Sequence, residues 1–194
     1  MKRNLTAVRL GLNAALGLVM ASLTACHEPS QGSASQAQPP ATPAPNAASQ
    51  TAALQPVAMQ AAAIKQLLLP AHGCNIETAD GAGYNTTLTR SRGATIELRG
   101  WVIDTMQHDV PVKAVLRLEN QDQQAAWMVP LQPRLVRTDV AQANGGLAAY
   151  TPSGFEISVA TSVLPAGHYH LYIEYAAAGR SYACDNGRML DLTH

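Results

Sequence analysis

From about residue 70 onward, apolar and polar positions alternate with a period of two in several short segments. The clearest alternating segments are 96–102, 114–119, 155–159 and 168–175. Such alternation is typical of strands with one face in a core and the other in solvent. Clusters of glycine and proline separate these segments, at 81–83, 144–146, 152–154 and 165–167. The pattern predicts an all-β fold, an antiparallel β-sandwich.

Two segments depart from this rhythm and predict short helices. Residues 59–69 are mostly apolar and stop at Pro70, so we expect a helix that ends at the residue before the proline. In the second segment, Asp139 can cap helix amides and Asn144-Gly145 can end a single turn. We expect this turn to cross between the two sheets, with Arg137 in contact with Asp139.

The start of the chain has the pattern of a targeting segment. A basic N-terminus precedes an apolar run at 10–23 that is too short to span a bilayer, which is typical of a signal peptide. The run ends in Leu-Thr-Ala-Cys at 23–26, which resembles the lipobox of bacterial lipoproteins. That resemblance implies removal of residues 1–25 and acylation of Cys26, which would anchor the chain in a membrane. The alternative is an ordinary secretory signal with an unrelated cysteine.

The residue after this cysteine bears on localisation. Among enterobacterial lipoproteins an aspartate at that position favours retention in the inner membrane, and here it is His27. The resemblance therefore implies a lipid-anchored protein of the bacterial outer membrane that faces the periplasm.

Residues 26–60 are rich in alanine, proline, serine and glutamine and hold six of the twelve prolines. They include too few apolar residues to build a core, so we expect a disordered, semi-extended tether. The β-sandwich domain is then expected at 61–194, with the short helix at its start.

The charge balance bears on the class of partner. The full chain has 13 basic and 13 acidic residues, and without the expected leader ten basic residues remain against thirteen acidic ones, a net charge of −3. Proteins that bind nucleic acid usually carry a basic excess. The balance therefore argues against a nucleic-acid partner.

Four short motifs occur in a fixed order within the expected sandwich. They are Gly100-Trp101-x-x-Asp104, Arg137-x-Asp139-Val140-Ala141, Gly154-Phe155 and Leu164-Pro165-x-Gly167-x-Tyr169. This set resembles a bacterial Ig-like β-sandwich module found in secreted and envelope proteins, and the resemblance covers roughly residues 95–178. It implies an accessory or interaction role and carries no catalytic residues across. The chain departs from the module by having its own cysteine pair.

With Cys26 assigned to the lipid, Cys74 and Cys184 remain in an oxidising compartment. A disulfide between them is the simple interpretation, and it would join the start of the body to its last strands. Closing a loop of about 100 residues stabilises a fold by up to roughly 4–5 kcal/mol in the chain-entropy model. The alternative is a redox or metal pair, which the lack of a C-x-x-C motif disfavours.

The spacing of His168 and His170 places both imidazoles on one face of a strand. Such a pair could hold a metal if His72, His108 or Asp185 supplied a third ligand. The simpler interpretation is a solvated sheet face, since the intervening apolar residues take the core. We therefore predict neither a metal site nor a cofactor.

Aromatic side chains offer a binding interpretation. Tyr172 shares the outward face with the two histidines, and Trp127 and Tyr150 lie in less regular stretches, whereas Trp101 is expected in the core. Exposed aromatic rings stack on sugars or anchor protein partners. The candidate binding residues are Tyr172, His168, His170, Arg137 and Asp139, the last two with a structural role as the first interpretation.

Three functions from different classes fit these features. The first is a non-catalytic envelope lipoprotein whose tethered β-sandwich binds a protein or glycan partner. The second is a structural assembly factor of a secretion or pilus apparatus, and the third is a metal-dependent enzyme that uses His168 and His170. The usual hydrolase and phosphate-loop motifs are missing from the sequence, which favours the first.

Overall fold

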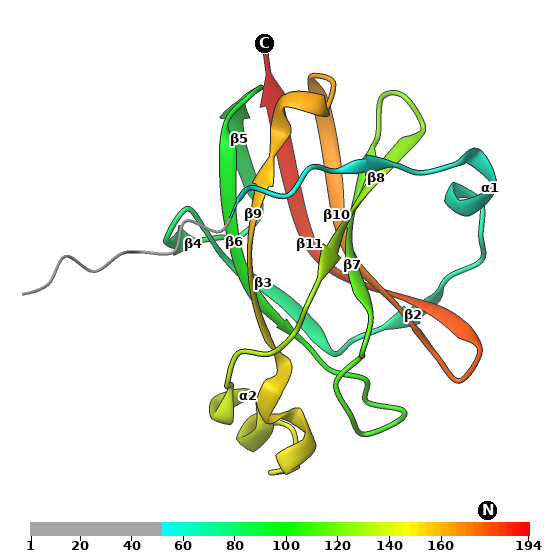
Figure 1. Cartoon of the computed structure of the whole chain (residues 1–194), viewed down its shortest axis with the longest axis vertical. Coiled ribbons are helices and arrows are strands. Elements are labelled where there is room, and N and C mark those ends of the chain that lie inside the picture. The colour runs from blue at the N-terminus through cyan, green and yellow to red at the C-terminus, as the bar shows by residue number, and fades with distance from the viewer. Residues whose placement is uncertain (1–51) are drawn as a thin grey trace, which may run out of the picture. The chain divides into compact units, whose positions relative to one another are not determined.

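The computed structural model describes residues 52–194, which form a β-rich domain of two sheets (Figure 1). One sheet has seven strands, in the order β1-β8-β7-β10-β11-β2, with β5 also paired to β11. Its strands are β1 (Val57–Ala58), β2 (Leu69–Ala71), β5 (Thr87–Ser91), β7 (Ala114–Asn120), β8 (Ala125–Leu131), β10 (Gly167–Ala177) and β11 (Arg180–Thr193). The other sheet has the order β4-β3-β6-β9, with β3 (Cys74–Ala79), β4 (Ala82–Gly83), β6 (Thr95–Val102) and β9 (Gly154–Ala160).

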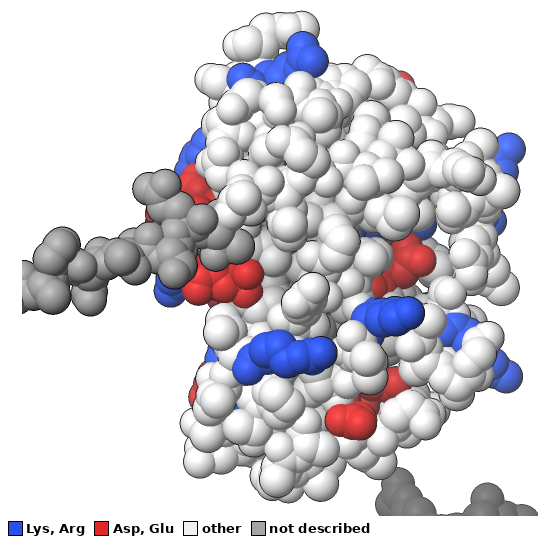
Figure 2. Space-filling model, in the orientation of Figure 1, with Lys and Arg blue, Asp and Glu red and all other residues white. Residues whose placement is uncertain are grey.

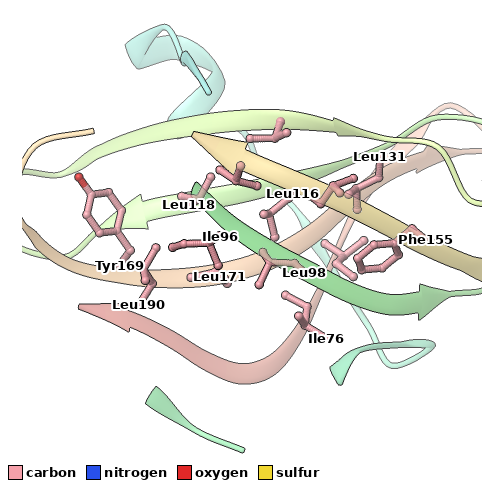
Figure 3. Close-up of a cluster of buried hydrophobic side chains, with 14 of the residues drawn as sticks. Ile76, Ile96, Leu98, Leu116, Leu118, Leu131, Phe155, Tyr169, Leu171 and Leu190 are labelled. Atoms are coloured by element: carbon pink, nitrogen blue, oxygen red, sulfur yellow. The ribbon is translucent and has the colours of Figure 1, made fainter. Parts of the chain in front are cut away.

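The four alternating segments of the sequence correspond to β6, β7, β9 and β10, so the prediction of a two-sheet β fold is confirmed. The inward side chains of these strands meet between the sheets (Figure 3). On β10, Tyr169, Leu171 and Ile173 are almost fully buried, while the residues between them lie on the outer face. The alternation arises because each strand is covered on one side only.

Two pairings differ from the antiparallel prediction. β2 and β5 both run parallel to β11, along its first and second halves respectively. These strands are short and lie at the edge of the sheet, and Pro70 sits in β2, where a residue without an N–H is tolerated. The remaining strand pairs are antiparallel.

The start of the domain also differs from prediction. Leu54 bridges Val159 of β9, and β1 pairs with β8, so these residues, which were expected in the tether up to residue 60, pair with strands of the domain. The expected helix at 59–69 is only α1 (Ala61–Ile64), which buries none of its residues. Residues beyond it leave the helix because Leu69 joins β2 beside β11. The expected leader, Cys26 and most of the tether lie outside the described residues.

Short helices lie between β8 and β10. They are α2 (Thr138–Ala143), the 3₁₀ helix η1 (Ala148–Ser153) and the 3₁₀ turn η2 (Thr161–Val163). The first two pack around a second apolar cluster made of Ile103, Val110, Val140, Ala141 and Tyr150. Within residues 52–194, the structure has no helix long and apolar enough to cross a membrane.

The predicted disulfide is confirmed. Cys74 of β3 and Cys184 of β11 are bonded, with their Cα atoms 6.1 Å apart, and both lie in the main core. The bond joins the two sheets to each other and closes the chain over a separation of 110 residues. It is therefore a structural bond of the sandwich.

Candidate functional site

The candidate binding residues His168, His170 and Tyr172 project from the outer face of β10, in the middle of the seven-stranded sheet. The two histidines differ in exposure. The His168 side chain is 64% exposed and that of His170 is 22% exposed. The inward residues between them belong to the core, which fixes the orientation of the whole row.

Each histidine has a carboxylate of its own. His168 Nδ1 lies 2.8 Å from Asp191 Oδ1, and His170 Nε2 lies 2.8 Å from Asp185 Oδ1. The hydrogen bond to Asp191, followed by the charges of Asp191 and Asp122, raises the pKa of His168 above its ordinary value.

The three proposed third ligands do not bring the histidines together. Asp185 binds one imidazole only, His108 Nδ1 lies 3.4 Å from the hydroxyl of Tyr150, and His72 is exposed between β2 and β3. Across residues 52–194 no three of the metal-ligating side chains His, Cys, Asp and Glu are grouped so that they could hold an ion.

A bulge in β11 creates the pair of His170 and Asp185. The register of β10 and β11 shifts between Leu171 and Tyr172, and Asn186 and Gly187 are the extra residues on β11. Gly187 has φ +70°, and its N–H donates to Asp185 Oδ1 at 2.7 Å. This bond holds the carboxylate that His170 contacts, so the bulge aims a side chain at the outer face.

His170 also links Asp185 to Tyr172. The Tyr172 hydroxyl lies 3.1 Å from His170 Nδ1, and the two rings stack with centroids 4.3 Å apart. In a neutral imidazole with its proton on Nε2, Nε2 donates to Asp185 and Nδ1 accepts from the phenol. Burial, then the charges of Glu119 and Asp185, raise the pKa of Tyr172, so its phenol keeps the proton at neutral pH. The row therefore presents fixed polar and aromatic groups and no activated phenolate.

Sequence reasoning missed Arg117, which lies on the same outer face directly opposite Tyr172 in the ladder of β7 and β10. The alternation in β7 places it on the solvent side, yet its side chain is only 4% exposed. The segment around α1 covers it, and Arg117 Nη2 donates to the carbonyl of Ile64 at 3.2 Å. No signal within β7 indicates this burial, because the cover comes from a segment 53 residues earlier.

Arg137 and Asp139 are in contact, as predicted, but Asp139 does not cap a helix. Arg137 donates from Nε to Asp139 Oδ1 at 2.9 Å and from Nη2 to Oδ2 at 2.6 Å. Helix α2 begins one residue before Asp139 and has no side-chain cap. The cap prediction is wrong because the N-cap residue is Arg137, and Asp139 lies inside the first turn of α2. The same bonds lower the pKa of Asp139 to about 2.

Arg137 binds a second carboxylate that sequence reasoning missed. Its Nη1 and Nη2 lie 2.8 and 3.1 Å from the two carboxylate oxygens of Glu77 on β3, and Trp101 Nε1 donates to the same Glu77 at 3.0 Å. A Cβ on Gly154 would lie 2.8 Å from Arg137 Cγ, so a glycine there leaves room for the arginine. Residues of three of the four sequence motifs therefore meet in one network, which ties the α2 crossover to β3.

The other aromatic candidates are distributed differently from expectation. Tyr150 lies in the second cluster at 2% exposure, and Trp127 packs edge-on against Tyr169 in the main core, so neither offers a free ring for binding. Trp101, expected in the core, is half-buried and packs on the second cluster. Of the candidate aromatic residues, only Tyr172 lies on the outer face of β10.

The chain matches no protein-family model and no curated protein. The structure shows a β-rich domain of two sheets, and the residues of this chain alone carry the functional proposal.

Proposed function

We propose that this chain is a non-catalytic envelope lipoprotein whose β-sandwich binds a protein or glycan partner through the outer face of β10 and β11. The observation that carries the proposal is the row His168, His170 and Tyr172, in which each ring is held by a carboxylate or by its neighbour. Side chains that are fixed before binding lose little conformational freedom when a partner docks.

The distribution of charge on the surface is more consistent with a protein or glycan partner than with a nucleic acid. On the face drawn in Figure 2, acidic and basic side chains are scattered among uncharged ones, with no broad basic field. The aspartates at positions 185 and 191 give the row an acidic character. A phosphate backbone would be repelled by such a row.

We propose further that the domain is Ig-like. Two packed sheets, a bond between a cysteine of each sheet, and a crossover helix tied to the opposite sheet support this assignment. The network that joins Glu77, Trp101 and Arg137 brings residues of two of the sequence motifs together.

The anchor is proposed from the lipobox resemblance alone. Acylation of Cys26 would attach the chain to the periplasmic side of the outer membrane. The residues that follow would hold the sandwich away from the bilayer, where the face of β10 and β11 can meet a partner.

Site-specific photo-crosslinking in intact cells tests the proposed face. A photoreactive amino acid replaces His168, which is well exposed, and the matched control replaces Glu97, an exposed residue on the outer face of β6. A discrete adduct from position 168 and none from position 97 supports the proposal. Adducts of equal yield at both positions, or none at either, would overturn it. An adduct with a component of a secretion or pilus apparatus would favour the assembly-factor alternative.

A further inference from the structure

The segment between β1 and β2 crosses the outer face of the seven-stranded sheet. β1 pairs with β8 at one edge of the sheet, and β2 pairs with β11 at the other. Residues 59–68, here called the strap, therefore pass over β7 and β10, and Figure 1 shows this path from β8 through α1 to β2. Ile64 of the strap contacts Arg117, which pairs with Tyr172 of the outer row.

Beneath the strap lies a group of polar side chains with incomplete bonding. Arg117 Nη2 reaches Glu119 Oε2 at 3.0 Å and the Ile64 carbonyl, while Nη1 lies 3.5 Å from Glu174 Oε2, too far for a well-formed hydrogen bond. Within residues 52–194, Arg117 Nε and Nη1 have no acceptor and Glu174 Oε2 has no donor. Buried donors and acceptors without partners are unfavourable, so such groups call for an explanation.

Few bonds hold the strap over these polar side chains. α1 has four residues and buries none of them, and Leu67 is 83% exposed. Within residues 52–194, the strap is bonded to the sheet by the Met59 N–H, which donates to the Ala126 carbonyl at 2.8 Å, by the bond from Arg117 to Ile64, and by one from Gln66 Nε2 to Ser181 Oγ at 2.9 Å. Both ends are fixed by strand pairing. Lifting the middle of the strap would therefore break these two side-chain bonds and no strand pairing.

We propose that Arg117, Glu174 and Tyr172 form a binding site under the strap for a neutral, hydroxyl-rich ligand such as a sugar. A hydroxyl both donates and accepts, so adjacent hydroxyls can satisfy the free N–H groups of Arg117 and the free oxygen of Glu174 together. Tyr172 pairs with Arg117 in the ladder of β7 and β10, and the face of its ring that does not stack on His170 supplies an apolar surface. The inference rests on the proposed binding function and names its ligand class.

The local charge selects against other ligands. One arginine faces two glutamates, Glu119 and Glu174, so the group has a net negative charge, which disfavours a phosphate or a uronic acid. A cationic ligand would leave Nε and Nη1 of Arg117 without acceptors. A neutral polyhydroxylated ligand meets both conditions.

The test uses the purified full chain and follows the side-chain Nε–H signal of Arg117 by NMR. The probes are maltose, cellobiose and N,N′-diacetylchitobiose, with glucuronic acid and spermidine as charged comparisons. We expect a saturable shift of the Arg117 signal with at least one neutral disaccharide, and faster hydrogen exchange of the strap amides in the bound state. Failure of all three neutral sugars to shift the signal, or tighter binding of a charged probe, would overturn the inference.

Variants locate the site. Glu174→Gln and Tyr172→Ala should each weaken sugar binding at least tenfold, and Gln66→Ala, which frees the strap, should tighten it severalfold. Arg99→Gln is the matched control, since Arg99 pairs with Glu156 on the opposite sheet, and it should bind as the wild type does. Unchanged binding in both site variants would overturn the assignment.

The outcome is separable from that of the photo-crosslinking. A protein adduct at position 168 without sugar binding refutes only this inference, and sugar binding without any adduct refutes a protein partner on the face of β10 and β11 and leaves the glycan.

Discussion

Arg137 binds Glu77 across 60 residues of sequence, and both of its terminal nitrogens contact that carboxylate. The pair joins the loop before α2 to β3 and receives a third member in Trp101, which donates to the same glutamate. Asp139 completes the network from the exposed side, with its own side chain 65% exposed. The crossover between the sheets is thus held from the opposite sheet rather than by a cap at the helix start.

The first prediction separates these two carboxylates. Arg137→Ala should lower the free energy of unfolding by about 1–2 kcal/mol, because it removes the bonds to Glu77 and to Asp139 together. Asp139→Ala should cost clearly less, because that carboxylate is in solvent and Glu77 still holds the arginine. Urea melts of both variants check this order. Equal losses would mean that Asp139 carries the crossover.

The second prediction concerns the bond between the sheets. Replacing Cys74 and Cys184 together by alanine should lower the free energy of unfolding by about 2–5 kcal/mol, because the loop that the bond closes is long and the bond lies in the core. Thermal melts of the full chain with and without reductant give the comparison. Reductant should lower the melting temperature of the wild type and leave the double variant unchanged, and a shift in the double variant would point to another thiol.

The strands that were predicted from the sequence are those in which apolar and polar residues alternate within the strand itself. β10 alternates cleanly between inward residues such as Leu171 and outward ones such as His170. β8 was missed because its outward residues, Met128 and Pro130, are as apolar as its inward ones. Its sequence therefore does not alternate in polarity. The burial of Arg117 was missed for a different reason, since its cover comes from the distant strap.

The pairing of the histidines with aspartates could not be derived by counting. Counting back from the turn between β10 and β11 without a bulge would place Met189 opposite His168. The bulge at Asn186 and Gly187 shifts the register and brings Asp191 there instead. A glycine in a strand is a known signal of a bulge, but one glycine does not give the number of extra residues.

The third prediction concerns the anchor, which lies outside the described residues. Cys26→Ser should abolish incorporation of labelled palmitate and release the protein from the membrane fraction, because the acylated thiol would be lost. A conservative change in the following residue, His27→Gln, serves as the control and should keep the label. Equal labelling of Cys26→Ser and wild type would refute the lipobox interpretation.

The last prediction is a pH dependence of stability at His168. In the folded state its pKa is raised above 6.5, the ordinary value of histidine, chiefly by the hydrogen bond to Asp191. A histidine whose pKa is raised on folding stabilises the fold fully below its unfolded pKa, and the contribution is lost as the pH rises through the folded pKa. His168→Gln should therefore lower the midpoint of urea unfolding at pH 5.5 and have little effect at pH 9. His72→Gln, at an exposed position between β2 and β3, is the matched control and should not reproduce this difference. A loss for His168→Gln that is equal at both pH values would mean that the imidazole acts by packing alone, and Asp191→Asn should then leave the pH profile of the wild type intact.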